Sequence, residues 1–80
     1  MSANRDKHGG AEYMRRTTFM DELMGETILY GGLPVRRADA YEDALSRTGS
    51  AWAAELFAFG PRAAAVDAEP LTREQLRRLP

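Results

Sequence analysis

The chain has 80 residues, with 12 acidic and 11 basic side chains, a formal net charge of −1 and no cysteine. This charge balance excludes the broad basic surface that is typical of nucleic-acid-binding domains, although a small basic patch stays compatible with it. The lack of cysteine excludes disulfides and thiolate metal sites. A chain of this length buries only about 60% of its unfolded surface, so we expect association with itself or with a larger protein.

The first segment, residues 1–12, is polar and glycine-containing, and we expect it to be a disordered head. It lacks the apolar stretch of a signal peptide. No apolar run anywhere approaches the roughly 18 residues needed to cross a bilayer. The sequence therefore predicts a cytoplasmic protein. The one histidine, His8, cannot build a metal centre alone, so we expect no metal and no cofactor.

Residues 13–30 carry apolar side chains at helical spacing, opposite an acidic face. Thr18 suits an N-cap, so the pattern predicts a helix over about residues 19–30. Gly31, Gly32 and Pro34 would end it. Two interpretations of the polar residues 15–18 remain open: solvated residues that merely precede or extend the helix, or a short polar ribbon that leads into it.

A second helical segment begins near Arg37. Its apolar residues stay in phase up to Phe59, namely Ala38, Tyr41, Leu45, Trp52, Leu56 and Phe59. Gly49 interrupts the segment, and Ser50 could cap a new helix. We predict one helix kinked at Gly49, with two separate helices as the alternative. Gly60 and Pro61 end the segment.

The C-terminal residues contain a helix-start signal. Thr72 and Gln75 have the spacing of a capping box, and Leu71 and Leu76 that of a hydrophobic staple. They predict a helix over residues 73–79, too short to be stable alone. The expected fold is mainly α: a short N-terminal ribbon or helix extension, two to three core helices and this short C-terminal helix, in a probable dimer.

Four short motifs lie in order along residues 15–47: Arg16-Thr17-Thr18, Asp21-Glu22-Leu23, Gly32-Leu33 and Glu42-Asp43-Ala44-Leu45. In this order they resemble ribbon-helix-helix antitoxins of the VapB type. The resemblance implies that residues 13–47 form a dimerisation and DNA-binding core. Paired strands of two subunits would enter the major groove. The implied DNA-binding residues are Arg15, Arg16, Thr18, Arg36 and Arg37.

The tail, residues 48–80, carries large apolar side chains that one small core cannot easily bury together. The resemblance implies that this region wraps a partner protein, with partner-binding residues Trp52, Leu56, Phe57, Phe59, Leu71 and Leu76. The alternative is that the tail folds back onto the other helices as a small bundle.

Catalytic signatures are missing from the pattern. Asp39, Glu42 and Asp43 have helical spacing, but nothing around them would raise a pKa, so a solvated helix face is expected. We therefore expect no catalytic residue and no enzyme, but a small antitoxin-like regulatory protein that binds a partner protein and operator DNA. The alternative is a helical accessory subunit that docks on a larger enzyme or particle without binding DNA.

Overall fold

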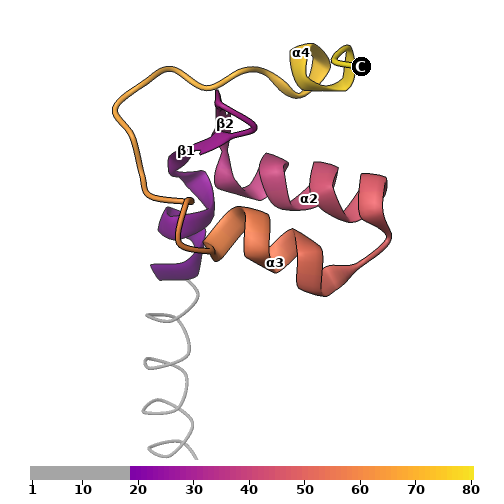
Figure 1. Ribbon diagram of the computed structural model, residues 1–80. Coiled ribbons are helices and arrows are strands. Elements are labelled where there is room, and N and C mark those ends of the chain that lie inside the picture. Colours follow the sequence, from indigo (N-terminus) through magenta and orange to yellow (C-terminus); the bar gives the residue numbers. More distant parts are fainter. Residues whose placement is uncertain (1–18) are drawn as a thin grey trace, which may run out of the picture.

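The computed structural model describes residues 19–80 (Figure 1). Residues 19–25 are helical. The named elements that follow are β1 (Thr27–Tyr30), β2 (Leu33–Arg36), α2 (Arg37–Thr48), α3 (Ala51–Phe59) and α4 (Arg73–Arg77). The predicted mainly helical class is confirmed in this coarse sense. The predicted disordered head and the predicted DNA-binding residues Arg15, Arg16 and Thr18 lie outside the described residues.

The first predicted helix is wrong over its last five residues. It ends at residue 25, and the following residues form an antiparallel hairpin in which Tyr30 pairs with Leu33 and Ile28 with Val35. Gly31 and Gly32 have φ of 59° and 83°, the two positive values that a tight type I′ hairpin turn requires. The apolar run before them fits a helix or a strand equally well, and here the turn decides for the strand.

The predicted single kinked helix is also wrong, and the two-helix alternative is right. Gly49 ends α2 in the left-handed conformation, with φ of 68°. The Ser50 side chain then accepts a hydrogen bond from the Ala53 backbone N–H at 3.2 Å and starts α3. The chain reverses between the two helices, so that α3 runs back beside α2 (Figure 1).

Alanines form the buried faces of the two helices. Ala40 and Ala44 of α2 and Ala54 and Ala58 of α3 are all at most 1% exposed. Each pair is spaced by four residues, so each makes a ridge of small side chains along its helix. Helices that meet through alanine approach closely and leave little room for larger residues between them. The large apolar residues of α3 therefore lie on its other faces.

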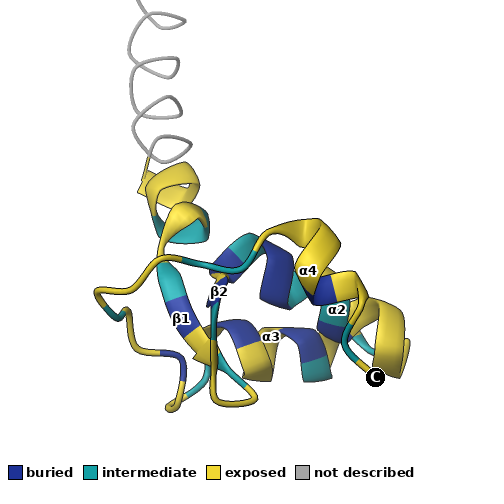
Figure 2. Ribbon diagram, turned by 90° about the horizontal axis from the view of Figure 1, so that it is seen from above, coloured by how far each residue is buried: buried dark blue, intermediate teal, exposed yellow. Residues whose placement is uncertain are grey.

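After α3 the chain wraps around the hairpin. The Val66 N–H donates to the Thr27 carbonyl at 2.8 Å, on the outer edge of β1. The Leu71 N–H donates to the Pro34 carbonyl at 2.9 Å, on the outer edge of β2. Figures 1 and 2 show this segment passing from α3 around the hairpin to α4. Both strand edges are therefore partly satisfied by the same chain.

The short helix α4 closes the core. The predicted capping box between Thr72 and Gln75 is present, and the helix ends at Arg77 rather than at residue 79. Leu76, 4% exposed, joins Ile28 and Val35 in the core, and Leu71 packs against the same cluster. This part of the tail folds back, as the bundle alternative predicted. No helix among residues 19–80 has the length and apolar character to span a bilayer.

Candidate protein-binding surface

Arg37 lies in the interior rather than on a DNA-facing turn. Its Nε donates to the Ala58 carbonyl at 2.8 Å, and one terminal nitrogen donates to the Ala63 carbonyl, also at 2.8 Å. The other terminal nitrogen donates to the Leu23 carbonyl at 2.9 Å and contacts the Glu26 carboxylate at 2.5 Å.

These contacts join the start of α2 to the helical residues 19–25, to the end of α3 and to the segment that follows it. The guanidinium has five N–H donors in a fixed fork, and the four contacts described above occupy four of these donors within the molecule. Arg37 is therefore a structural residue with no free side for a phosphate. Its neighbour Arg36 is exposed.

The outward face of α3 is apolar. Trp52 is 73% exposed, Leu56 50% and Phe59 42%. Their spacing of four and three residues places them on one side of the helix, opposite the buried Ala54 and Ala58. Figure 2 shows the resulting alternation of buried and exposed residues along α3. Among the predicted partner-binding residues, these three come together as one continuous stripe.

The stripe is held in place at its C-terminal end. The Arg37 guanidinium lies over the Phe59 ring, 5.5 Å from its centroid, and this cation–π contact fixes one face of the ring. Gly60 follows, and a Cβ at that position would lie 2.2 Å from the Leu56 carbonyl oxygen. The close approach lets the chain turn away directly after Phe59, so that the stripe ends at an abrupt edge.

Phe57 points from α3 toward the hairpin rather than along the stripe. Its ring meets Tyr30 edge to face, with centroids 5.6 Å apart and planes at 87°. Beside it lies a hollow of about 670 Å³ between the β1–β2 turn and α3, within the roughly 300–1,000 Å³ range of ligand pockets. The residues that line it are Leu29, Gly31, Gly32, Leu56, Phe57, Pro61 and Arg62.

Leu29, Pro61 and Arg62 line the hollow, although the sequence pattern did not indicate them as surface candidates. Leu29 is 48% exposed although its neighbour Ile28 is fully buried. This alternation is the period of a strand with one buried face. A helix over residues 27–30 would place Leu29 on the buried face. The prediction of a helix there therefore hid the strand alternation that exposes Leu29.

Leu71 and Leu76 are the two predicted partner-binding residues that lie neither on the stripe nor in the lining of the hollow. Both pack within the chain's own core. They fasten the tail to the hairpin. Among the described residues, most of the large exposed apolar side chains lie on α3 and the hairpin, whereas Phe19, Met20 and Leu45 are exposed elsewhere.

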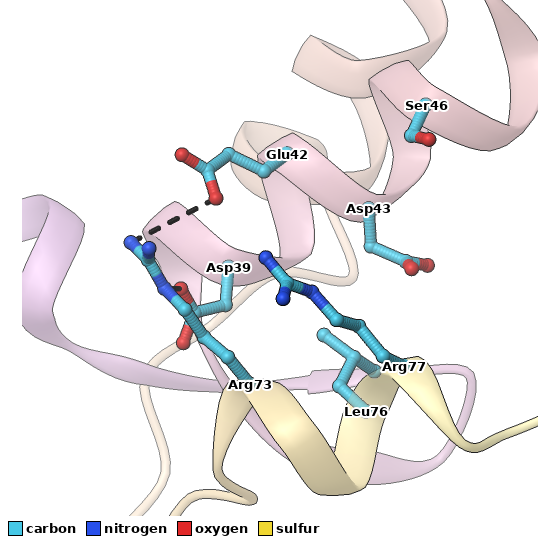
Figure 3. A pocket seen from close by; sticks show the side chains of 7 residues that line it. All are labelled: Asp39, Glu42, Asp43, Ser46, Arg73, Leu76 and Arg77. Atoms are coloured by element: carbon cyan, nitrogen blue, oxygen red, sulfur yellow. Dashed lines mark hydrogen bonds and ion pairs between the residues drawn. The ribbon is translucent and has the colours of Figure 1, made fainter.

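A second, polar cleft of about 240 Å³ lies between α2 and α4 (Figure 3). The Arg73 Nε donates to Asp39 at 2.8 Å, and another Arg73 nitrogen lies 3.7 Å from Glu42. The bond to Asp39 raises the pKa of the Arg73 guanidinium above its usual range. Asp39 is only 6% exposed, so the expected fully solvated face is wrong at this position. The cleft is a set of ion pairs that fastens α4 to α2.

Asp43, on the next turn of α2, forms a further polar contact with the hairpin. The Tyr30 hydroxyl donates to Asp43 at 2.6 Å, and the Arg47 Nε donates to the same carboxylate oxygen at 2.7 Å. Burial, with the hydrogen bond to Asp43 as a further cause, raises the pKa of Tyr30 to about 12. Arg47 also donates to the Leu79 and Pro80 carbonyls, at 3.3 and 3.2 Å.

No group of three or more His, Asp or Glu side chains in residues 19–80 is arranged to hold a metal ion. Comparisons with protein-family models, with curated proteins and with solved structures find no match to this chain. The apolar surface of α3 and the adjacent hollow are therefore the candidate site.

Proposed function

We propose that this chain is a small non-catalytic binding protein that docks on a larger partner protein through the outward face of α3. The observation that carries the proposal is the inverted placement of side chains on α3, where alanines are buried and Trp52, Leu56 and Phe59 are exposed. Apolar surface removed from water stabilises a complex by about 25 cal/mol per Å². Tryptophan is also among the residues that most often dominate binding energy.

The anchor spacing supports a helix-mediated contact. Residues at i, i+4 and i+7 are the pattern by which an amphipathic helix enters an apolar groove. The helix is pre-formed, because Ser50 caps its start and Arg37 holds its end. A pre-formed anchor loses less conformational entropy on binding than a segment that must fold first.

The test uses the single tryptophan as its own probe. The full-length chain is used to capture proteins from an extract of the native host, and a captured protein is purified and titrated against the chain. We expect Trp52 emission to shift to the blue and iodide quenching to decrease on binding. The Leu56→Ser variant should bind at least tenfold more weakly. Leu45→Ser, which removes a 38% exposed leucine from α2, is the matched control.

The proposal fails if the captured protein binds while Trp52 stays fully open to iodide. It also fails if Leu56→Ser and Leu45→Ser weaken binding equally, because the contact would then not depend on this face. Circular dichroism of each variant confirms that the fold is retained.

The narrower form of the proposal is an antitoxin-like regulator, whose partner is a toxin and whose residues Arg15, Arg16 and Thr18 contact operator DNA. The sequence resemblance supports it, and so does the exposed position of Arg36. In a gel-shift titration with the chain's own promoter region, binding should fall steeply with salt because phosphate contacts release counterions. Unchanged binding by Arg16→Ala would exclude the ribbon.

The accessory-subunit alternative has two specific observations in its favour. Residues 27–30, which belong to the first helix in the resemblance, form strand β1, and Arg37 makes its contacts inside the fold. A protein that docks on a larger enzyme or particle without binding DNA needs neither a first helix that includes residues 27–30 nor an Arg37 side chain that is available to phosphate. Absence of any salt-dependent DNA binding, together with retained partner capture, would favour this alternative.

A further inference from the structure

We propose that the hollow between the β1–β2 turn and α3 receives an apolar side chain of the partner protein, with an acidic residue beside it that pairs with Arg62. This inference rests on the proposed function and specifies the chemistry of the partner. The hollow adjoins the α3 stripe, since Leu56 belongs to both. A partner that covers the stripe therefore also reaches the hollow.

The hollow is built to accept an apolar group. Leu29 and Phe57, 48% and 49% exposed, line it from the hairpin and from α3, and Pro61 also lines it. Gly31 and Gly32 line it without side chains, and apart from their chain neighbours no atom of residues 19–80 lies within 4 Å of where their Cβ atoms would be. The turn therefore leaves open space through which a partner's side chain can enter.

Arg62 gives the hollow its charge. It is the only charged residue among the seven that line the hollow. The salt bridges formed within residues 19–80 involve Arg37, Arg47, Arg73 and Arg78, and Arg62 is not among them. A carboxylate brought by the partner would find an exposed guanidinium next to an apolar surface, where a charge-assisted hydrogen bond is stronger than in open water.

This combination selects a partner segment in which a large apolar residue stands near an aspartate or glutamate. A purely apolar segment would leave Arg62 without a counter-ion at the edge of the contact. A basic segment would be repelled. Charge complementarity thus provides specificity in addition to the affinity that the apolar contact supplies.

The experiment selects binders from a random twelve-residue peptide display library, with the immobilised full-length chain as the target. Selected peptides are synthesised, and their affinities are measured by fluorescence anisotropy. We expect them to carry a large apolar residue within a few positions of an acidic one. Arg62→Glu should weaken their binding at least tenfold, and replacing the acidic residue of the peptide by lysine should restore binding to this variant.

Two matched controls separate the hollow from general surface effects. Arg78→Glu reverses an exposed arginine on the tail, and Leu45→Ser removes an exposed leucine outside the hollow. Both should bind the selected peptides as the wild type does, whereas Leu29→Ser should weaken binding like Arg62→Glu. Circular dichroism verifies the fold of each variant.

The proposal is overturned if no peptide is selected, if the selected peptides show no acidic preference, or if Arg62→Glu binds them unchanged. It is also overturned if sedimentation equilibrium shows a dimer of the free chain that Arg62→Glu dissociates, because the occupant would then be a second copy. Trp52 does not line the hollow. If the wild-type chain binds no peptide while Trp52 still responds to the captured partner, only the hollow is refuted. If the wild-type chain binds the acidic peptides while Trp52 does not respond to the captured partner, only the α3 contact is refuted.

Discussion

Helices α2 and α3 lie side by side, yet they divide polar and apolar residues in opposite ways. α2 buries two charged residues, Arg37 and Asp39, which are 5% and 6% exposed. α3 carries no buried charge and leaves its largest apolar residue, Trp52, 73% exposed. Burial in these two helices therefore follows from the partners available at each position rather than from the hydrophobicity of the side chain.

The reason on the α2 side is geometric. Buried charges cost several kcal/mol unless they are paired and hydrogen-bonded. Arg37 meets three fixed backbone carbonyls and one carboxylate, and Asp39 meets Arg73. On the α3 side, contact through alanine brings the helices close and leaves no interior volume for an indole or a phenyl ring.

The largest effect is expected at Arg37. Arg37→Met keeps the apolar stem but leaves three carbonyls and Glu26 without their donors. We expect the free energy of unfolding to fall by about 3–5 kcal/mol, as for a broken buried pair. Urea denaturation followed by circular dichroism measures it, and Arg36→Met, an exposed neighbour, should change it by less than about 0.5 kcal/mol. Equal effects would show that Arg37 is not structural.

The alanine contact comes next. Ala54→Leu adds volume at a position that is fully buried on the inner face of α3. We expect a loss of about 1–3 kcal/mol in the free energy of unfolding, because overpacking forces the helices apart. Ala51→Leu, at the exposed start of the same helix, is the matched control. A stabilised Ala54→Leu variant would mean that the α2–α3 contact has unfilled space.

The Tyr30–Asp43 bond predicts an alkaline loss of stability. Tyrosine ionises near pH 10 in the unfolded chain, whereas Tyr30 in the folded chain has a pKa of about 12. The unfolded chain therefore releases its proton first, and stability present below pH 10 is lost as the pH rises toward 12. Two pKa units correspond to roughly 2.7 kcal/mol, and the partial exposure of the ring reduces the expected loss to about 1–2 kcal/mol.

Thermal melts of the wild type and Tyr30→Phe at several pH values between 9 and 12 isolate this contribution. The variant should be less stable at neutral pH and should lose less stability over the alkaline interval. Tyr41→Phe, which removes another partly buried phenol, serves as the control. Parallel curves for the wild type and Tyr30→Phe would contradict the prediction.

The smallest effect on stability is expected at the largest side chain. Trp52→Ser removes an indole that is 73% exposed, so the free energy of unfolding should change by less than about 0.5 kcal/mol. Urea denaturation followed by circular dichroism gives the comparison. A destabilisation of about 2 kcal/mol or more would place Trp52 in the core of the isolated chain and remove the main argument for a docking surface.

Much of the local structure could be predicted from the sequence. The capping box at Thr72, the cap at Ser50 and the stop at Gly60 depend on short-range hydrogen bonds and backbone preferences, and these are present as the residue types suggest. The sequence pattern did not predict the hairpin, because the apolar run Ile28-Leu29-Tyr30 is too short to distinguish the period of a strand from that of a helix. The Gly31-Gly32 pair was the available signal, and it was assigned to a helix end instead of a turn.

The candidate site was predicted in part. The α3 residues were named as partner-binding from their number and closeness, since four large side chains exceed what so small a core can hold. Leu71 and Leu76 were named with them, although they pack in the chain's own core. Their local pattern shows an apolar face that must be covered, but it does not show whether the cover is a partner or the chain itself.

The sequence by itself determined the helix starts at Ser50 and Thr72 and the stop at Gly60, that disulfides and thiolate metal sites are excluded, and that large apolar side chains exceed the available core. The tertiary structure alone decided that Arg37 is internal, that alanines rather than aromatics join α2 to α3, and that Leu29 and Arg62 meet at one hollow. The physical reason is distance along the chain. Caps and turns depend on neighbours a few residues away, whereas the Arg37 contacts join residues 14, 21 and 26 positions apart, and only folding brings these together.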